Sequence, residues 1–440
     1  MFAALTIAGS DSGGGAGIQA DLRAFSSLGV HGSSVLTCVT SQNTVRVGNI
    51  YPLPVEQVLS QMDAVLEDIE ISAVKTGMLY SAPIARAVIG RLEEEDLPLV
   101  IDPVMVAGVG DPLHVSDFVE ALRGTVVPAA HLLTPNRQEA EAITGTGIDS
   151  ESSARAACRE LVDMGAGSVL LKGGHMDGEE AVDLLLHDDQ FHRFSSPRLD
   201  LRGHGGGCTL SSYIAGFTAR GAELLEAVSR GKESIWQAYS TSYRVGKGVD
   251  IVDSSGPLRR EAMRYTLMRD LEAAVREVET ILPMGWVPEV GMNFVHALPG
   301  ALSPSDVCGV QGRISVVEGR LTHPRCLSFG ASKHVATIVL TAMRFDPGVR
   351  SALNLRYSEA HVQALKDSNL TLGSFDRADE PEEGSTMEWG TYRAISDLQE
   401  VPDAIFDRGG VGKEPMIRLL GESPEEVLVK LRAIIQTVVQ

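Results

Sequence analysis

Short apolar runs and helical stretches alternate over roughly the first 200 residues of the chain. The apolar runs predict buried strands at residues 3–8, 72–76, 98–102, 131–134 and 168–172, with helices between them at 18–28, 55–67, 82–93, 136–144 and 151–163. Apolar strands that alternate with helices are typical of a parallel sheet covered by helices on both faces. Two further runs, at 181–186 and 190–194, predict an antiparallel hairpin at the edge of this sheet.

A glycine-rich stretch, residues 203–207, has four glycines in five positions and precedes a helix predicted over 208–220. So many glycines disfavour the interior of a strand or helix, and a loop is expected. A loop that leads into a helix N-terminus leaves backbone N–H groups unpaired, with the helix dipole behind them, and such sites bind phosphate and other anions. A flexible turn explains a glycine run alone equally well. Cys208 stands where the anion would lie, which favours a site.

A second glycine-rich turn, residues 9–17, follows the first predicted strand. It lacks the Gly-Lys-Ser/Thr ending of a Walker A loop and is a weak match to a dinucleotide fingerprint. Polar residues stand near the ends of the apolar segments, where parallel sheets bind their ligands. These residues are Asp21, Gln42, Asp102, Asn136, Glu139 and Lys172. Taken alone, Asp21 and Gln42 are better explained as cap or surface residues.

The composition is that of a globular chain with more than one domain. The chain has 440 residues, of which 44% are hydrophobic and 22% charged, and a net charge of −20. This length predicts two or three domains. The acidic balance argues against general binding to nucleic acid or to an anionic membrane. Any phosphate site must therefore be a local basic pocket in an acidic protein.

The cysteines and the N-terminus indicate a cytoplasmic protein. The five cysteines include no C-x-x-C pair, which is typical of reduced thiols rather than of a disulfide framework. Residues 1–11 have no basic segment before their short apolar run, so no signal peptide is predicted. No apolar run approaches the length of a membrane span.

The pattern changes near residue 257, where we predict a domain boundary. Residues 221–250 are expected to be helical and to close the first domain. Residues 254–257, Ser-Ser-Gly-Pro, then combine linker and helix-start signals. The following helix, predicted over 258–281, carries an apolar stripe that is typical of packing. The predicted domains are residues 1–256 and 257–440.

The second half of the chain has a basic region within an acidic protein. Residues 311–356 contain seven Lys or Arg against two acids, which suggests an anionic ligand, although a solvated charged face is an alternative. Residues 329–343 predict a loop that enters a helix, which again is an anion-site geometry. His323 and Cys326 lack a second ligand pair at zinc spacing, so a structural role is favoured for them.

Seven separated motifs in the first half resemble one enzyme family. They are AGSDSGGGAGIQADL, VTSQNT, VKTGML, DPVMVA, LLTPNRQEAE, VLLKGGH and HGGGCTLSS. In this order and at these spacings they resemble hydroxymethylpyrimidine kinase/phosphomethylpyrimidine kinase, over roughly residues 1–250. The resemblance implies a ribokinase-like α/β fold and two successive phosphorylations of hydroxymethylpyrimidine that use ATP and Mg²⁺.

The same resemblance implies roles for the polar residues. Asp21 and Gln42 would bind the pyrimidine, and Asp102 and Glu139 would organise magnesium. The ATP and phosphate ligands would be Lys172, Gly205, Gly206, Gly207, Asn136 and Glu139. One departure is Gly206, where the family more often has threonine.

Cys208 is the expected catalytic residue of the kinase. Most relatives of the fold have an aspartate base at this position, but the acceptor of a second transfer is a phosphate, which is already ionised. A carboxylate beside that phosphate would repel it, whereas a small neutral side chain tolerates both steps. The helix N-terminus is expected to lower the pKa of Cys208, which leaves open a weak-base role in the first transfer.

The second half resembles the archaeal-type thiamine-phosphate synthase domain over roughly residues 260–438. The motifs are GRI at 312–314, RCLSFGASKHVA, NLRYS at 354–358 and DRGGVGKEPMIRLLG. This reaction expels pyrophosphate from hydroxymethylpyrimidine diphosphate and joins the methylene carbon to the nitrogen of thiazole phosphate. Cations must meet the developing charge. Arg313 and His334 match the family's functional arginine and histidine, and Arg320, Lys333 and Lys413 are weaker candidates.

The sequence thus predicts a cytoplasmic bifunctional enzyme of thiamine biosynthesis, in which a ribokinase-like kinase domain precedes a smaller α/β synthase domain. Its partners would be hydroxymethylpyrimidine and its phosphates, ATP and thiazole phosphate, with no nucleic acid and no membrane. We also expect a homodimer. Two alternatives remain: the second domain senses thiamine phosphate without catalysis, or the kinase acts on another vitamin such as pyridoxal. Cys208 and Gln42 argue against a sugar kinase.

Overall fold

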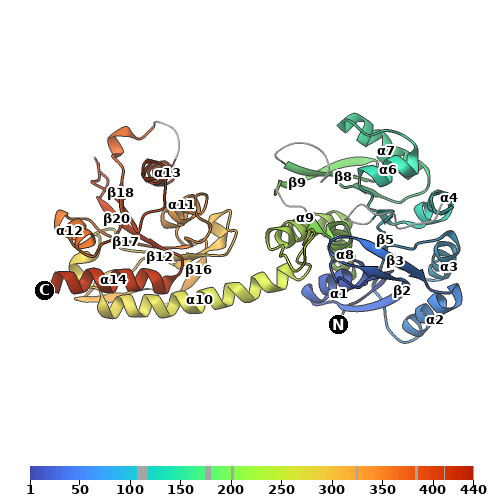
Figure 1. Cartoon of the computed structure of the whole chain (residues 1–440), viewed down its shortest axis with the longest axis horizontal. Coiled ribbons are helices and arrows are strands. Elements are labelled where there is room, and N and C mark those ends of the chain that lie inside the picture. Colours follow the sequence, from blue (N-terminus) through green and yellow to red (C-terminus); the bar gives the residue numbers. More distant parts are fainter. Residues whose placement is uncertain are drawn as a thin grey trace. The chain divides into compact units, whose positions relative to one another are not determined.

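The computed structural model describes residues 1–106, 117–173, 180–199, 203–323, 326–381, 385–410 and 412–439. The chain forms two compact units, Met1–Arg259 and Arg260–Gln440 (Figure 1). Helix α10 (Gly256–Ile281) begins at the end of the first unit and continues into the second. The boundary expected at residue 257 lies in the first turn of this helix.

The first unit is built on a nine-stranded sheet with the order β3-β2-β1-β4-β5-β6-β7-β8-β9. The strands are β1 (Ala3–Asp11), β2 (His31–Gln42), β3 (Val47–Pro52), β4 (Ala73–Thr76), β5 (Leu99–Ile101), β6 (Leu132–Leu133), β7 (Val169–Leu171), β8 (Glu180–His187) and β9 (Gln190–Pro197). Six neighbouring strands are parallel, in the order β2, β1, β4, β5, β6 and β7. Strands β8 and β9 form the predicted antiparallel hairpin at one edge. The opposite edge, where β3 is antiparallel to β2, was not predicted.

Helices cover both faces of this sheet (Figure 1). One face is covered by α2 (Val55–Leu66), α3 (Ala82–Leu92), α6 (Arg137–Thr144) and α7 (Glu151–Asp163), and the other by α1 (Gly17–Ser27), α8 (Gly206–Ala219) and α9 (Leu224–Ser240). A hydrophobic core lies between the sheet and each set of helices, and alternate residues of β1 pack into the two cores. Leu5 and Ile7 face the first set of helices, and Ala4 faces the second. The predicted doubly covered sheet is confirmed.

One predicted helix is too long. Residues 221–250 were expected to be helical, but α9 ends at Ser240. The following segment contains Gly246 and Gly248, which are poor helix formers and pack closely against Thr44. It leads into a short strand, β11 (Asp250–Ile251), which pairs with β10 (Gly203–His204). This pairing fixes the start of the glycine-rich stretch.

The second unit is a seven-stranded sheet of order β16-β13-β12-β17-β20-β19-β18, in which only β18 and β19 are parallel among the described strands. The strands are β12 (Phe294–Ala297), β13 (Val307–Val310), β16 (Leu327–Phe329), β17 (Ser351–Arg356), β18 (Leu372–Ser374), β19 (Ala404–Asp407) and β20 (Met416–Gly421), beside a hairpin of β14 (Ser315–Val317) and β15 (Arg320–Thr322). One face packs on α11 (Lys333–Ala342) and α13 (Thr386–Leu398), and the other on α10, α12 (Glu359–Asp367) and α14 (Pro424–Val439).

The predicted apolar stripe of α10 packs against this second face, as expected. Its members Leu267, Leu271, Ala274 and Val278 are buried. None of the helices in the described part of the chain is long and apolar enough to span a membrane.

Candidate active site

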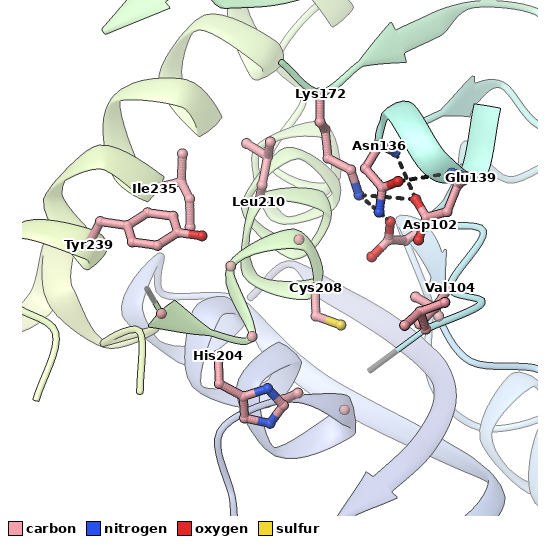
Figure 2. A pocket seen from close by; sticks show the side chains of 18 of the residues that line it. Asp102, Val104, Asn136, Glu139, Lys172, His204, Cys208, Leu210, Ile235 and Tyr239 are labelled. Carbon is pink, nitrogen blue, oxygen red and sulfur yellow. Dashed lines mark hydrogen bonds and ion pairs between the residues drawn. The ribbon is translucent and has the colours of Figure 1, made fainter. Parts of the chain in front are cut away.

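A cavity of about 490 Å³ lies beyond the carboxyl ends of the parallel strands of the first unit. The glycine-rich stretch and the ends of β1, β2 and β5 surround it, and α9 forms a further wall (Figure 2). Of the residues expected at a site, the cavity is lined by Gln42, Asp102, Asn136, Glu139, Lys172, Gly205, Gly206, Gly207 and Cys208. The fold therefore brings together residues that are up to 166 positions apart in the sequence, between Gln42 and Cys208.

The glycine loop (residues 203–207) turns into the N-terminus of α8. Gly205 has φ +89°, a left-handed conformation that favours glycine. A Cβ atom on Gly205 would overlap the carbonyl oxygen of Gly15, and a Cβ on Gly207 would lie 3.2 Å from Lys172 Nζ. Because Gly205, Gly206 and Gly207 have no side chains of their own, the backbone N–H groups of this first turn are available to a bound anion.

Cys208 points from the first turn of α8 toward the cavity (Figure 2). Burial raises the pKa of its thiol to about 12, and the nearby Lys75 opposes this shift only in part. The expectation of a lowered pKa is therefore wrong, because the loss of solvation on burial raises it. At neutral pH Cys208 is a protonated thiol.

A cation and two carboxylates meet at the opposite side of the cavity (Figure 2). Lys172 Nζ lies 2.7 Å from Asp102 Oδ1 and 3.8 Å from Glu139 Oε2. Burial alone would lower the pKa of Lys172, but the two carboxylates outweigh it and hold that pKa above its usual value. Burial raises the pKa of Glu139 to about 7, against the opposing charge of Lys172.

Asn136 and Glu139 hold the start of α6 in a capping box. The Asn136 side chain accepts a hydrogen bond from the backbone N–H of Glu139 at 2.9 Å. Glu139 Oε2 in turn accepts one from the backbone N–H of Asn136 at 2.7 Å. Reciprocal bonds of this kind stabilise a helix N-terminus. The local structure thus fixes Glu139 beside Lys172.

Gln42 belongs to a polar cluster that the sequence analysis did not identify. His204 Nε2 lies 3.0 Å from both Asp11 Oδ2 and the Gln42 amide. Asp11 also accepts bonds from the backbone N–H groups of Gly13, Gly15 and Ala16. Burial alone would raise the pKa of Asp11, but the bonds from His204 and the backbone outweigh it and lower that pKa. The sequence did contain a signal for this cluster, since Asp11 comes shortly after the predicted strand 3–8 and His204 interrupts the glycines of residues 203–207.

Asp21 lies behind the cavity rather than in its lining. It is fully buried, and Lys75 Nζ donates to both of its oxygens at 2.9 Å. Thr6 and Ser212 donate to the same carboxylate at 2.6 and 2.7 Å. The ion pair and its two hydroxyl donors tie α1, β1, β4 and α8 together.

The α9 wall of the cavity combines apolar and charged groups. Ile235, Trp236 and Tyr239 line it together with Lys232. Lys232 Nζ donates to Asp183 Oδ2 at 2.8 Å, and the other oxygen of Asp183 accepts from the backbone N–H of Gly173. This pair joins α9 to the edge hairpin. These residues lie on an amphipathic helix, so their sequence pattern could not be distinguished from that of a helix that only packs against the core.

The candidate residues of the second unit are exposed. His334 and Lys333 lie in the first turn of α11, so the predicted helix start is confirmed. The Arg313 guanidinium donates to the carbonyl oxygen of Val290. In the described residues, no hydrogen bond or ion pair joins Arg313 to His334. Arg320 lies in β15, and Lys413 Nζ donates to Glu380 at 2.9 Å.

The buried charges of the second unit lie elsewhere, around Asp407. Arg418 and Arg377 bind its carboxylate at 2.6 Å each. Asp407 Oδ1 also accepts a hydrogen bond from the backbone N–H of Gly409. Burial alone would raise the pKa of Asp407, but the two guanidinium groups lower it. The sequence analysis missed this cluster, although an arginine within the apolar run MIRLLG was a signal for it.

His323 and Cys326 do not form a metal centre in the described structure. His323 Nδ1 lies 2.7 Å from Glu279 Oε1, and Cys326 is exposed. Within the described ranges, no group of three or more His, Cys, Asp or Glu residues is placed to hold a metal ion.

The parallel-dominated sheet, the anion loop at a helix N-terminus and the Lys172 cluster define a kinase of the ribokinase-like class. The first unit is similar in structure to the ADP complex of Bacillus subtilis pyridoxal kinase, with a TM-score of 0.54 and 33% identity, over 58% of this chain and 98% of that one. The pyridoxal kinase from Staphylococcus aureus, in complex with AMP-PCP and pyridoxal, has a TM-score of 0.54 and 30% identity, over 58% and 94% of the two chains.

Two family models match the chain: phosphomethylpyrimidine kinase at residues 11–253 and thiamine-phosphate synthase ThiN at residues 228–433. The bifunctional thiamine biosynthesis protein ThiDN of Methanocaldococcus jannaschii is 30% identical over 440 residues, which are 98% of this chain and 97% of that protein. The hydroxymethylpyrimidine/phosphomethylpyrimidine kinase of Streptomyces coelicolor is 45% identical over 250 residues, 57% of this chain and 93% of that protein. The chain belongs to the phosphomethylpyrimidine kinase family and carries a ThiN thiamine-phosphate synthase domain after the kinase.

A further relative matches this chain over about half of its own length. The bifunctional protein ThiED of Geobacter sulfurreducens is 48% identical over 246 residues, which are 56% of this chain but only 50% of that protein. The predicted family, fold and general function are confirmed: this is a thiamine biosynthesis enzyme with a kinase and a synthase domain.

Proposed function

We propose that the first unit phosphorylates hydroxymethylpyrimidine and then its monophosphate, and that the second unit joins the diphosphate to thiazole phosphate. The observation that carries the kinase part is the meeting of the glycine loop, Lys172, Asp102 and Glu139 in one cavity. Backbone N–H groups and a lysine can stabilise the charge of a transferring phosphoryl group. We place the domain boundary at residue 257.

The carboxylates beside Lys172 fit a magnesium ion. Lys172 and Thr134 both approach Asp102 Oδ1, and among the described residues no hydrogen bond uses Oδ2. Magnesium is usually held by one or two carboxylates together with phosphate oxygens and water. We therefore assign Asp102 and Glu139 to Mg²⁺, which when bound would offset the charge of the ATP phosphates. Asn136 holds the backbone that presents Glu139.

Cys208 serves the two acceptors as a neutral side chain. With a pKa of about 12 it keeps its proton and does not act as a base. This suits the second transfer, in which a carboxylate would repel the phosphate acceptor. The first transfer does not need a strong base, because phosphoryl transfer passes through a loose transition state that depends on positioning and charge stabilisation.

The pyrimidine is bound near Gln42, whose amide can pair with a ring nitrogen and an amino group. The direct pyrimidine contact that was expected of Asp21 is replaced in this proposal by a positioning role. Lys75, Thr6 and Ser212 already use the oxygens of Asp21. Through Ser212, Asp21 holds the helix that carries Cys208.

In the second unit, Arg313 and His334 are proposed to meet the leaving pyrophosphate. Both side chains are exposed, and His334 stands at a helix start, where an anion is stabilised. The cytoplasm as location and a homodimer as assembly state stay predictions.

One assay tests the whole proposal. Purified protein is incubated with hydroxymethylpyrimidine, ATP, magnesium and thiazole phosphate, and the products are separated by chromatography. Thiamine phosphate is expected, with the pyrimidine diphosphate as intermediate. Diphosphate without thiamine phosphate would favour a sensing second domain. Phosphorylation of pyridoxal in preference to hydroxymethylpyrimidine would overturn the kinase assignment.

A further inference from the structure

Gly206 and Tyr239 lie against each other at the anion loop. A Cβ atom on Gly206 would overlap the Tyr239 hydroxyl and would lie 2.6 Å from the ring carbon Cζ. Tyr239 is on α9, 33 residues further along the chain. Its phenol reaches across from that helix toward the loop (Figure 2). The space that a side chain at residue 206 would fill is therefore occupied by a hydroxyl from another element.

The Tyr239 hydroxyl is available to a ligand. Tyr239 lines the cavity, and within the described residues no hydrogen bond uses its hydroxyl. The ring is held in place, because a Cβ on the neighbouring Gly203 would lie 2.9 Å from its Cε1 atom. Burial raises the pKa of the phenol, with Lys172 opposing. The hydroxyl consequently keeps its proton and can donate it in a hydrogen bond.

We propose that Tyr239 is a phosphate-binding residue of the kinase: its hydroxyl donates a hydrogen bond to the phosphoryl group held at the glycine loop. The loop itself offers only backbone N–H groups at residues 205–207, and Lys172 approaches it from the Gly207 side. Tyr239 covers the Gly206 side. A phosphoryl group on the loop would then be flanked by a cation and a phenol donor. This inference rests on the proposed phosphate site.

The bond would act in both phosphorylations, since the same loop serves both. A hydrogen bond to an ionised acceptor contributes about 1.5–3 kcal/mol. Tyr239→Phe should thus lower kcat/KM for ATP about ten- to a hundredfold, with hydroxymethylpyrimidine or its monophosphate as acceptor. The matched control is Tyr51→Phe, which removes the same atom from an exposed tyrosine of β3 outside the cavity and should leave both steps unchanged.

A reciprocal exchange separates a phosphate contact from a packing role. Tyr239→Leu removes the hydroxyl and the ring atoms that would collide with a side chain at residue 206. Gly206→Thr alone should be impaired by the collision. The double variant, Gly206→Thr with Tyr239→Leu, places a hydroxyl on the loop itself. Its kcat/KM for ATP should be about tenfold higher than that of Tyr239→Leu. The affinity for a non-hydrolysable ATP analogue, measured by calorimetry, should rank the variants in the same order as their kcat/KM values.

The outcomes are distinct. An inactive wild-type enzyme would refute the proposed kinase reaction and leave Tyr239 without a role. An active wild type with Tyr239→Phe within twofold of it would overturn the Tyr239 proposal alone. If Tyr239→Phe stays within twofold of the wild type and Tyr239→Leu alone is impaired, the ring supports the loop by packing and the hydrogen bond is refuted.

Discussion

The buried ion pair of Lys75 and Asp21 offers a sharp test of what holds the kinase unit together. Both side chains are 0% exposed, and Asp21 also accepts bonds from Thr6 and Ser212. Lys75→Met keeps the length of the side chain but leaves a buried carboxylate without its cation. Breaking a buried pair in this way typically costs about 3–5 kcal/mol.

The expected loss of stability is large enough to measure by thermal unfolding. A unit of this size shifts its Tm by about 2–4 °C per kcal/mol, so Lys75→Met should lower the Tm by about 6–20 °C. The full chain is examined by scanning calorimetry, and the transition that rises on addition of ATP and magnesium belongs to the kinase unit. The control is Arg230→Met, which breaks an exposed ion pair with Glu226 on α9 and should cost under about 1 kcal/mol.

A second variant isolates the charge. Asp21→Asn combined with Lys75→Met removes both charges and should recover more than half of the loss, because no uncompensated carboxylate remains. A loss of less than about 1 kcal/mol for Lys75→Met, or a double variant no more stable than Lys75→Met, would refute the reasoning. The Asp21 carboxylate would then be protonated or solvated rather than paired.

Three further predictions concern the two sites. Because the pKa of Cys208 is about 12, the kinase rate should show no thiol ionisation between about pH 6 and 9, and Cys208→Ser should keep most activity in both phosphorylations; a rate that rises with a cysteine titration would contradict the neutral role. The pKa of Glu139, raised from 4.5 to about 7, means that the folded state retains a proton that the unfolded state releases, so stability should fall as pH rises between these values and Glu139→Gln should flatten that slope in urea unfolding. Arg313→Ala and His334→Ala should each lower thiamine phosphate formation about a hundred- to a thousandfold while the pyrimidine diphosphate accumulates; full synthase activity with an unchanged circular dichroism spectrum would favour the sensing alternative.

Much of the kinase unit could be predicted because its strands, helices and anion loop each have a local sequence pattern. Apolar runs gave the strands, and the glycine stretch marked the anion loop. Asp102, Asn136, Glu139 and Lys172 could be found because the carboxyl ends of parallel strands meet at one edge of a sheet. These four residues do line one cavity.

What could not be predicted depends on contacts between distant segments. His204 lies 193 residues from its partner Asp11, and Tyr239 is one of two aromatic residues on the amphipathic helix α9. A lysine inside the buried strand SAVKT indicates that a buried counter-ion is needed, and Asp21 is that counter-ion. In the second unit, strands of three to six residues give little periodicity, so its largely antiparallel sheet was not foreseen.

The cysteines give the chain a useful chemical asymmetry. All five lie within the described residues, and Cys326 of the second unit is the exposed one. Burial raises the pKa of Cys38 to about 11 and those of Cys158, Cys208 and Cys308 to about 12, so their nucleophilic thiolates are scarce at neutral pH. Alkylating reagents and mild oxidants should therefore meet Cys326 first and spare the thiol in the kinase cavity. The native chain can accept a single fluorescent or spin label on its synthase unit without any cysteine being removed.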